Sequence, residues 1–236
     1  MILAVSFDVW NTLLNTDVLF RRLAKLVSVM RGLDPVEVEA IIYETYKKVR
    51  ELRLFIVNSD EVRVFPMRSR HLLAKMLNID FEELVKAIDA IFASLDIDSI
   101  LFKDVKPTLD VLSSLNLKLG VIGNTAFWES IYTRELLDRS GIKEYLNVQL
   151  YSDEVGIFKP DKRIFLEFCK RLNVKPQEVL HIGDSVIEDV GGSLSSGMKV
   201  MMINRAGNAR KVIVPEVGLM ITHSLSDAIE AIQVLD

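Results

Sequence analysis

Short apolar runs occur at five places along the chain, and each is typical of a strand that is buried on both faces of a parallel sheet. The runs cover residues 2–7, 117–122, 148–151, 179–182 and 200–203. Helical patterns lie between them: one starts at Pro107, a second follows Asp161 as its N-cap, and a third is the closing segment SDAIEAIQVL. This alternation predicts an α/β fold with a doubly wound parallel sheet.

A different pattern covers residues 16–98, where apolar residues recur at helical spacing and strand signals are scarce. Three amphipathic stretches share it, and the third follows Asp80, an expected N-cap with Glu83 three residues further on. The apolar positions are Leu19, Leu23, Leu26, Val27 and Met30; Val38, Ile41, Ile42, Tyr46, Val49 and Leu52; and Leu84, Val85, Ile88, Ile91 and Phe92. We therefore expect an all-helical insert.

The insert divides the chain into two predicted domains. Residues 1–15 and 99–236 form the expected Rossmann-like α/β core, and residues 16–98 form the expected helical cap. Because the insert follows the first strand directly, it should lie above the carboxyl ends of the strands, where open α/β sheets bind ligands. The cap carries no motif that identifies a substrate.

The composition fits a globular protein that folds without disulfides. Half of the 236 residues are hydrophobic, and Cys169 is the one cysteine, which indicates a reducing compartment. The net charge of −4 argues against a nucleic-acid-binding protein. The apolar runs are too short to span a membrane, and no basic segment precedes the first of them. We expect a cytoplasmic protein that binds neither membrane nor nucleic acid; the oligomeric state stays open.

Polar residues that suit a catalytic site follow the first four predicted strands. They are Asp8, the turn Gly123-Asn124-Thr125, Lys159 before a proline, and the pair Asp184 and Asp189. The carboxyl ends of parallel strands face the same side, so these residues are expected to lie close together. Three carboxylates near one lysine repel one another, and a divalent cation relieves that repulsion; carboxylate oxygens suit Mg²⁺.

With these motifs in this order, the chain resembles the haloacid dehalogenase superfamily over essentially its full length. The matching pattern is an aspartate after the first strand, a small polar residue after the second, a lysine before proline, and G-D-x-x-x-x-D after a late strand. The helical insert is similar to the cap that such proteins carry between their first and second motifs. The resemblance therefore implies the same fold that the hydrophobic pattern predicts.

The resemblance also implies a hydrolase in which Asp8 is a covalent nucleophile, and water hydrolyses the intermediate. In the phosphatase branch, Mg²⁺ bridges the nucleophile and the phosphoryl group of a small anionic substrate. The implied metal ligands are Asp8, the backbone carbonyl of Trp10 and Asp184, with Asp189 as a further ligand or as a partner of the ligands. Lys159 is implied to neutralise charge and to hold Asp8, and the Gly123-Asn124-Thr125 turn to donate hydrogen bonds to phosphoryl oxygens.

Two positions depart from the phosphatase pattern. Phosphatases of this family usually have a second aspartate two residues after the nucleophile, which protonates the leaving group. This chain has Trp10 there, and an indole N–H cannot shuttle a proton at neutral pH. An aromatic residue at this position is more similar to the 2-haloacid dehalogenases. Gly123 stands where most members have Ser or Thr, so a backbone N–H or Thr125 would have to supply that phosphoryl contact.

Asp184 weighs against the dehalogenases. They need no metal and carry uncharged residues at this position, and a second carboxylate beside Asp8 would raise its pKa and weaken it as a nucleophile. We therefore expect a Mg²⁺-dependent phosphomonoesterase that acts on a small phosphorylated metabolite. The first alternative is a 2-haloacid dehalogenase that displaces halide without metal. The second is a weakly active or non-catalytic protein that binds a phosphorylated ligand.

Several other polar residues have simpler interpretations. His181 on the fourth strand is expected to be a packed core residue. Ser185 and Glu188 fit a capping box that starts the next helix. Four arginines lie in or near the insert: Arg50, Arg53, Arg63 and Arg68. Each is expected on a solvated face, with contact between one of them and an anionic substrate as the alternative.

Overall fold

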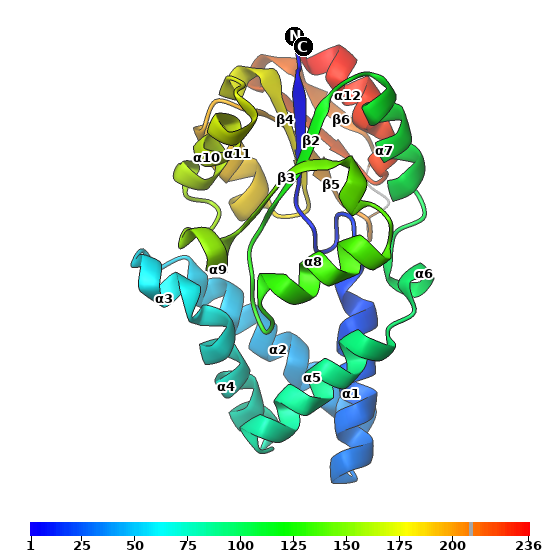
Figure 1. The fold of residues 1–236 in the computed structure, drawn as a ribbon, viewed down its shortest axis with the longest axis vertical. Coiled ribbons are helices and arrows are strands. Elements are labelled where there is room, and N and C mark those ends of the chain that lie inside the picture. The colour runs from blue at the N-terminus through cyan, green and yellow to red at the C-terminus, as the bar shows by residue number, and fades with distance from the viewer. Residues whose placement is uncertain (208–209) are drawn as a thin grey trace.

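The five predicted strands all form, and they belong to a single sheet of seven. The computed structural model describes residues 1–207 and 210–236. The strands are β1 (Ala4–Phe7), β2 (Lys118–Gly123), β3 (Leu146–Tyr151), β4 (Val179–Gly183), β5 (Lys199–Ile203), β6 (Val212–Val214) and β7 (Leu219–Thr222). Their order is β3-β2-β1-β4-β5-β7-β6, and every neighbouring pair is parallel except β6 and β7. The α/β fold with a mostly parallel sheet is thereby confirmed (Figure 1).

Strands β6 and β7 were not predicted. Both are short: the stretch VIV forms β6 and LMIT forms β7, and runs of three and four residues give almost no periodic signal. β7 extends the sheet in parallel beside β5, and β6 returns antiparallel at the edge. The edge therefore differs from the all-parallel sheet that the sequence indicated.

Helices cover both faces of the sheet. On one side lie α10 (Lys162–Leu172) and α11 (Gly192–Ser195), and on the other lie α7 (Val105–Ser114) and α12 (Ala228–Leu235) (Figure 1). α10 shows why the sequence folds this way, because its apolar residues Phe165 and Phe168 are fully buried against Ile122 and Leu150 of the sheet. The double-sided cover confirms the doubly wound arrangement.

The helix starts can be compared with their sequence signals. Asp161 accepts a hydrogen bond from the backbone N–H of Arg163 at 2.9 Å, and Asp80 accepts one from Glu82 at 2.8 Å, as expected of N-caps. Pro107 was wrongly placed, because α7 begins two residues earlier, at Val105. The first N–H groups of a helix have no partner within it, so proline is tolerated throughout the first turn.

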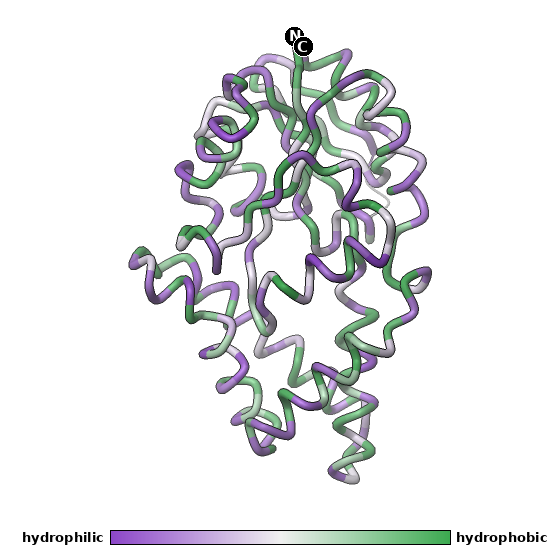
Figure 2. Tube along the Cα trace, viewed as in Figure 1, coloured by the Kyte–Doolittle hydropathy of each residue, from purple (hydrophilic) through white to green (hydrophobic). Residues whose placement is uncertain are grey.

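Residues 16–98 are helical, as predicted. The helices are α1 (Thr16–Arg31), α2 (Pro35–Arg53), α3 (Ser59–Arg63), α4 (Phe65–Leu77), α5 (Phe81–Ser94) and, just beyond, α6 (Ile97–Ile100). Figure 2 shows hydrophobic positions along the central strands and hydrophobic positions that alternate with hydrophilic ones along these helices. Most of the predicted apolar positions are buried or half-buried, but Met30 and Leu52 near two helix ends are 43% and 50% exposed.

One apolar core joins the helices to the sheet. It runs without interruption from Phe7 of β1 through Leu13 and Leu19 to Ile42 of α2 and Leu84 of α5. The proposed boundary between a core and a cap thus lies inside continuous packing, and the division stays a prediction. Among the described residues, none of the helices combines the length and apolar character that crossing a membrane requires.

The remaining elements are short or lie between strands. They are α8 (Ser130–Arg139), α9 (Ser152–Val155), the 3₁₀ turns η1 (Lys143–Tyr145), η2 (Pro176–Glu178), η4 (Pro215–Val217) and η5 (Leu225–Asp227), and the π-helical turn η3 (Val186–Gly191). π-helical turns often occur at functional sites. η3 follows β4 and carries one of the candidate site residues, Asp189.

Candidate active site

Three carboxylates meet at the carboxyl ends of β1 and β4. Asp8 follows β1, Asp184 follows β4, and Asp189 comes from η3. One carboxylate oxygen of each lies within 4.8 Å of the other two. Asp8 and Asp189 are buried and Asp184 is half-buried. The structure therefore brings together the three acidic residues that the strand pattern placed at this edge of the sheet.

Lys159 connects two of these carboxylates. Its side chain is buried, and Nζ donates hydrogen bonds to Asp8 Oδ1 at 2.7 Å and to Asp189 Oδ1 at 2.6 Å. A buried ammonium needs such partners because burial alone strongly disfavours its charge. The two carboxylates accordingly hold the pKa of Lys159 above its usual range, against burial, which lowers it.

Both carboxylate oxygens of Asp189 accept hydrogen bonds. Oδ1 accepts hydrogen bonds from Lys159 and from His181 Nε2, the latter at 3.0 Å, and Oδ2 accepts one from the backbone N–H of Ser185 at 2.9 Å. Gly183 permits this approach, because a Cβ there would stand 2.2 Å from Asp189 Cγ. Asp189 therefore positions Lys159, His181 and the backbone of Ser185 through these hydrogen bonds. Within the described chain, Asp184 accepts no hydrogen bond, and Asp8 accepts one on Oδ1 alone.

His181 is buried, as predicted, but it is also part of this network. A carboxylate can only accept, so the proton of the imidazole lies on Nε2, facing Asp189. Nδ1 then accepts a hydrogen bond from the Ser6 hydroxyl at 2.8 Å. Burial lowers the pKa of His181, which keeps the ring neutral. A continuous buried chain of hydrogen bonds therefore runs from Ser6 to Lys159 and the candidate nucleophile.

The carboxylates differ in how readily they ionise. Burial raises the pKa of Asp8 to about 6, although Lys159 lowers it. Burial, together with the charges of Asp8 and Asp189, raises the pKa of Asp184 to about 8, and Arg50 offsets this only in part. For Asp189, Lys159 and His181 outweigh burial and hold the pKa well below its usual range. A cation beside Asp8 and Asp184 would favour their charged forms.

These residues fit Mg²⁺ by the nature of their free oxygens. Asp8 Oδ2 and both oxygens of Asp184 are open, and the Trp10 carbonyl accepts no hydrogen bond within the described residues. Carboxylate and carbonyl oxygens are the ligands that Mg²⁺ prefers. The Trp10 side chain packs edge to face against Trp128, with ring centroids 5.2 Å apart.

Asn124 fixes the backbone of Lys159. Its Nδ2 donates to the Lys159 carbonyl at 3.0 Å, and its Oδ1 accepts from the Lys159 N–H at 2.9 Å. Asn124 was predicted to contact substrate, and it does line the cavity beside Asp8, but both ends of its amide are engaged by Lys159. The side chain therefore positions the lysine from the loop after β2.

Of the other two residues of the turn after β2, Gly123 has no side chain and Thr125 has its hydroxyl beside Ser152. The Thr125 hydroxyl is 3.0 Å from Ser152 Oγ, which also accepts the Thr125 N–H at 2.9 Å. A Cβ at Gly123 would stand 3.0 Å from the buried ring of Tyr151. The packing of Tyr151 thus explains the absence of Ser or Thr at position 123.

Two arginines expected on solvated faces extend from α2 toward the site instead. Arg53 is buried rather than solvated, with its Nη2 2.9 Å from Glu188 Oε1 and its Nη1 3.2 Å from the Thr125 carbonyl. Arg50 is half-buried and donates to Ser185 Oγ at 3.1 Å. Their i, i+3 spacing was the one available signal, since it places both on one side of the helix. Arg63 and Arg68 are exposed, as expected.

The expected capping box is only half present. Ser185 Oγ accepts the Glu188 N–H at 3.1 Å, as an N-cap should. The Glu188 side chain does not return to the Ser185 N–H, because that N–H donates to Asp189 and Glu188 pairs with Arg53 instead. Glu188 therefore joins α2 to the loop after β4, a role that the short sequence pattern hid.

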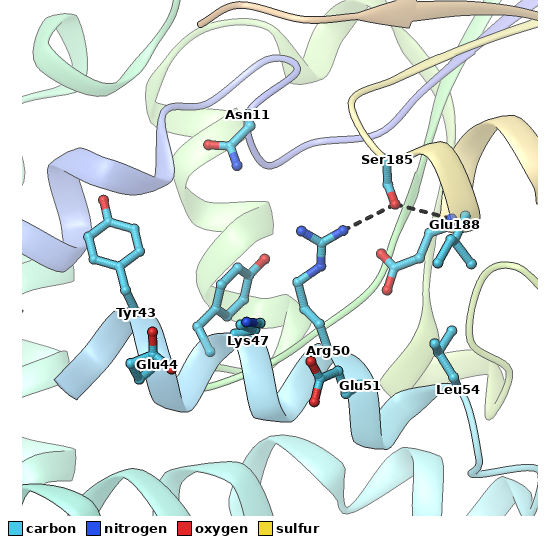
Figure 3. Close-up of a pocket in the computed structure, with 11 residues that line it drawn as sticks. Asn11, Tyr43, Glu44, Lys47, Arg50, Glu51, Leu54, Ser185 and Glu188 are labelled. Carbon is cyan, nitrogen blue, oxygen red and sulfur yellow. Dashed lines mark hydrogen bonds between the residues drawn. The ribbon is translucent and has the colours of Figure 1, made fainter. Parts of the chain in front are cut away.

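Two connected cavities lie between α2 and the strand ends. The inner one, about 20 Å³, is lined by Asp8, Trp10, Asn11, Tyr46, Arg50, Arg53, Asn124, Asp184 and Glu188. The outer one, about 530 Å³, is lined chiefly by α2, with Asn11 and the Ser185–Glu188 turn opposite (Figure 3). Asn11, Tyr46, Arg50 and Glu188 line both, and Figure 3 shows Arg50 reaching from α2 toward Ser185. The inner cavity holds little more than one water molecule, so the room for a substrate lies in the outer cavity.

Comparison with known proteins gives a consistent family. A family profile for haloacid dehalogenase-like hydrolases matches residues 2–197. A glyceraldehyde 3-phosphate phosphatase of Methanopyrus kandleri is 32% identical over 211 residues, which cover 87% of this chain and 85% of that protein. The (S)-2-haloacid dehalogenase 4A of Burkholderia cepacia is 27% identical over 219 residues, covering 87% of this chain and 84% of that protein.

Solved structures show the same fold. A HAD phosphatase from Thermococcus onnurineus superposes with a TM-score of 0.65 at 24% identity and covers 98% of both chains. A 2-haloacid dehalogenase from Pseudomonas syringae gives 0.63 at 24% identity, covering 99% of both chains. The same fold thus occurs in a phosphatase and in a dehalogenase, so the fold alone does not distinguish the two activities. The sequence matches show the family: this chain belongs to the haloacid dehalogenase-like hydrolases.

Proposed function

We propose that the chain is a Mg²⁺-dependent phosphomonoesterase that acts on a small phosphorylated compound. The observation that carries this proposal is Asp184, a half-buried carboxylate beside Asp8 that no donor of the described chain satisfies. Such a group is costly unless an ion or a proton compensates it. The relatives named glyceraldehyde 3-phosphate phosphatase support a phosphorylated substrate of small size.

In the proposed reaction, a carboxylate oxygen of Asp8 attacks the phosphorus, and the bond from phosphorus to the leaving oxygen breaks. The resulting aspartyl phosphate is then hydrolysed by water, which returns the free carboxylate and inorganic phosphate. Mg²⁺, held by Asp8, Asp184 and the Trp10 carbonyl, would neutralise phosphoryl charge. Lys159 keeps Asp8 ionised and oriented through its 2.7 Å hydrogen bond, and Asp189 and Asn124 hold Lys159.

We also assign positions to the rest of the proposed site. The helical segment 16–98 would act as the cap, because α2 closes over the cavity at Asp8. The phosphoryl group would lie against the backbone of the Gly123-Asn124-Thr125 turn, since the side chains of that turn are absent or engaged. The leaving group would extend into the outer cavity of about 530 Å³.

The test is release of phosphate and of halide by the same preparation. We expect p-nitrophenyl phosphate to be hydrolysed with Mg²⁺, with activity lost in a chelator and restored by added Mg²⁺. Asp8→Asn should abolish turnover, because an amide is a poor nucleophile. Asp184→Asn should weaken Mg²⁺ binding more than Asp189→Asn, because Asp184 accepts no hydrogen bond among the described residues whereas both oxygens of Asp189 accept one or more.

One observation favours a second candidate function. Trp10 leaves the site without an aspartate two residues after the nucleophile, and one related sequence is named (S)-2-haloacid dehalogenase 4A. Chloride release from 2-chloropropionate that persists in a chelator would replace the phosphatase proposal with a dehalogenase. If neither phosphate nor chloride is released, but inorganic phosphate and Mg²⁺ raise the Tm, the protein binds a phosphorylated ligand without turning it over.

A further inference from the structure

Arg50 occupies the junction between the inner cavity at Asp8 and the outer cavity. It is one of four residues that line both, with Asn11, Tyr46 and Glu188, and it is the one cation among them. Its guanidinium makes one hydrogen bond, from Nη2 to Ser185 Oγ, and within the described chain it forms no ion pair. A guanidinium has five N–H donors, so most of those on Arg50 are open to the cavities.

Arg53, three residues later on the same helix, differs in each of these respects. Its Nη2 pairs with Glu188 Oε1 at 2.9 Å and its Nη1 donates to the Thr125 carbonyl at 3.2 Å. Its side chain therefore fastens α2 to the loops after β2 and β4. With α2 fixed in this way, Arg50 is presented to the cavity by a rigid support.

Side-chain donors for a phosphoryl group are few in the turn after β2 and at Lys159, although Asn11 and Tyr46 also line the inner cavity. Gly123 has no side chain, and the Thr125 hydroxyl lies 3.0 Å from Ser152 Oγ. Two of the three N–H groups of Lys159 are used by Asp8 and Asp189. A phosphoryl group carries three oxygens that need donors, and a guanidinium matches two of them at once.

We infer that Arg50 binds the phosphoryl oxygens of the substrate and takes the place of the hydroxyl missing at position 123. This inference rests on the proposed phosphatase function and adds to it a phosphoryl-binding residue contributed by α2. Arg50 would shift its donors from Ser185 to the phosphoryl group at the mouth of the inner cavity. Specificity for phosphorylated compounds would then depend on α2 as well as on the strand ends.

The test is binding of inorganic phosphate to the Mg²⁺-loaded protein by calorimetry, with Mg²⁺ affinity measured separately. Arg50→Met should weaken phosphate binding roughly 10- to 100-fold, because a charge-assisted, bidentate contact is lost. Arg50→Lys should fall between Arg50→Met and the wild type, because it keeps the charge without the planar pair of donors. Lys48→Met is the matched control: it removes one charge from an exposed position on α2 that lines neither cavity.

The outcomes separate this inference from the proposed function. A wild-type protein that binds phosphate while Arg50→Met binds it within twofold overturns the inference alone. So does an equal loss in Lys48→Met, which would reduce the effect to general charge, or a loss that follows Mg²⁺ affinity. A wild-type protein that binds no phosphate with Mg²⁺ overturns the proposed function as well. Steady-state kinetics give a second readout, since KM should rise in both Arg50 variants.

Discussion

The ring of Tyr151 fills the place that a side chain at Gly123 would need. A Cβ built on Gly123 stands 3.0 Å from Tyr151 Cδ1 and 3.1 Å from Cε1, and the ring is 1% exposed. Contacts this short require the ring to shift, and a packed core resists such shifts. The glycine in the second motif is therefore tied to an aromatic residue at the end of β3.

Gly123→Ala should accordingly destabilise the protein by about 1–2 kcal/mol, because the added methyl overpacks the core. In a Tyr151→Leu background, the same substitution should cost less, since the smaller side chain leaves room. Urea denaturation of the four proteins of this double-mutant cycle measures the coupling. An equal cost in both backgrounds would show that Tyr151 is not the obstacle.

Trp10→Asp should restore the missing general acid. An indole cannot protonate a leaving oxygen, so the wild-type protein should strongly prefer good leaving groups such as p-nitrophenolate. The aspartate should raise kcat/KM for glycerol phosphate relative to p-nitrophenyl phosphate by roughly 10²-fold. This ratio is insensitive to any loss of folded protein from the broken contact with Trp128. Trp10→Asn, of nearly the same size but without a proton to give, should leave the ratio unchanged.

His181→Leu should lower both stability and turnover. The substitution removes one donor from Asp189 and leaves the Ser6 hydroxyl without its acceptor, which together should cost about 2–3 kcal/mol. Lys159 and Asp8 should then be less well held, so kcat should fall while KM changes little. His181→Gln keeps an N–H donor and should recover part of both losses. A His181→Leu protein with normal kcat would limit the histidine to packing.

Mg²⁺ binding should strengthen as the pH rises toward 8. The ion requires ionised carboxylates, and the pKa of Asp184 is raised to about 8 and that of Asp8 to about 6. Below pH 8, the dissociation constant should fall by up to about tenfold per pH unit, with proton release on binding. Calorimetry in buffers of different ionisation enthalpy measures both quantities. An affinity that is flat between pH 6 and 8 would contradict this prediction.

The same raised pKa predicts how stability depends on pH in a chelator. A folded carboxyl with a raised pKa binds more protons than the unfolded one, so its contribution to stability is lost as the pH rises through the folded value. Between pH 6.5 and 8.5, the metal-free protein should therefore lose about 2 kcal/mol through Asp184. Asp184→Asn should abolish this dependence, and saturating Mg²⁺ should reduce it.

The sequence was sufficient to predict five of the seven strands and the acidic trio. The sequences of buried parallel strands are continuous apolar runs, and the polar residue after such a run indicates where the strand ends. Strand ends share one edge, so Asp8, Asp184 and Asp189 could be placed together without any side-chain geometry. The N-caps at Asp80 and Asp161 were predictable because capping depends on the adjacent residues alone.

Contacts between distant segments could not be predicted. Arg53 and Glu188 are 135 residues apart, and each has an ordinary local interpretation, as a solvated charge and as part of a capping box. His181 looked like core and is core, but its link to Asp189 becomes visible only in three dimensions. The short strands β6 and β7 were missed because tertiary pairing, and not local pattern, makes them strands.

The two hydrogen bonds between the Asn124 side chain and the Lys159 backbone limit how this protein can be recombined with its relatives. The Asn124 side chain pairs with the backbone N–H and carbonyl of Lys159, 35 residues further along the chain. The position of that backbone depends on the length of the loop that carries Lys159. If only one of the two loops were replaced by that of a relative, the Asn124–Lys159 hydrogen bonds would be mismatched in spacing. The Lys159 side chain would then no longer be directed at Asp8. The segments after β2 and after β3 should therefore be inherited, or transplanted, as a pair.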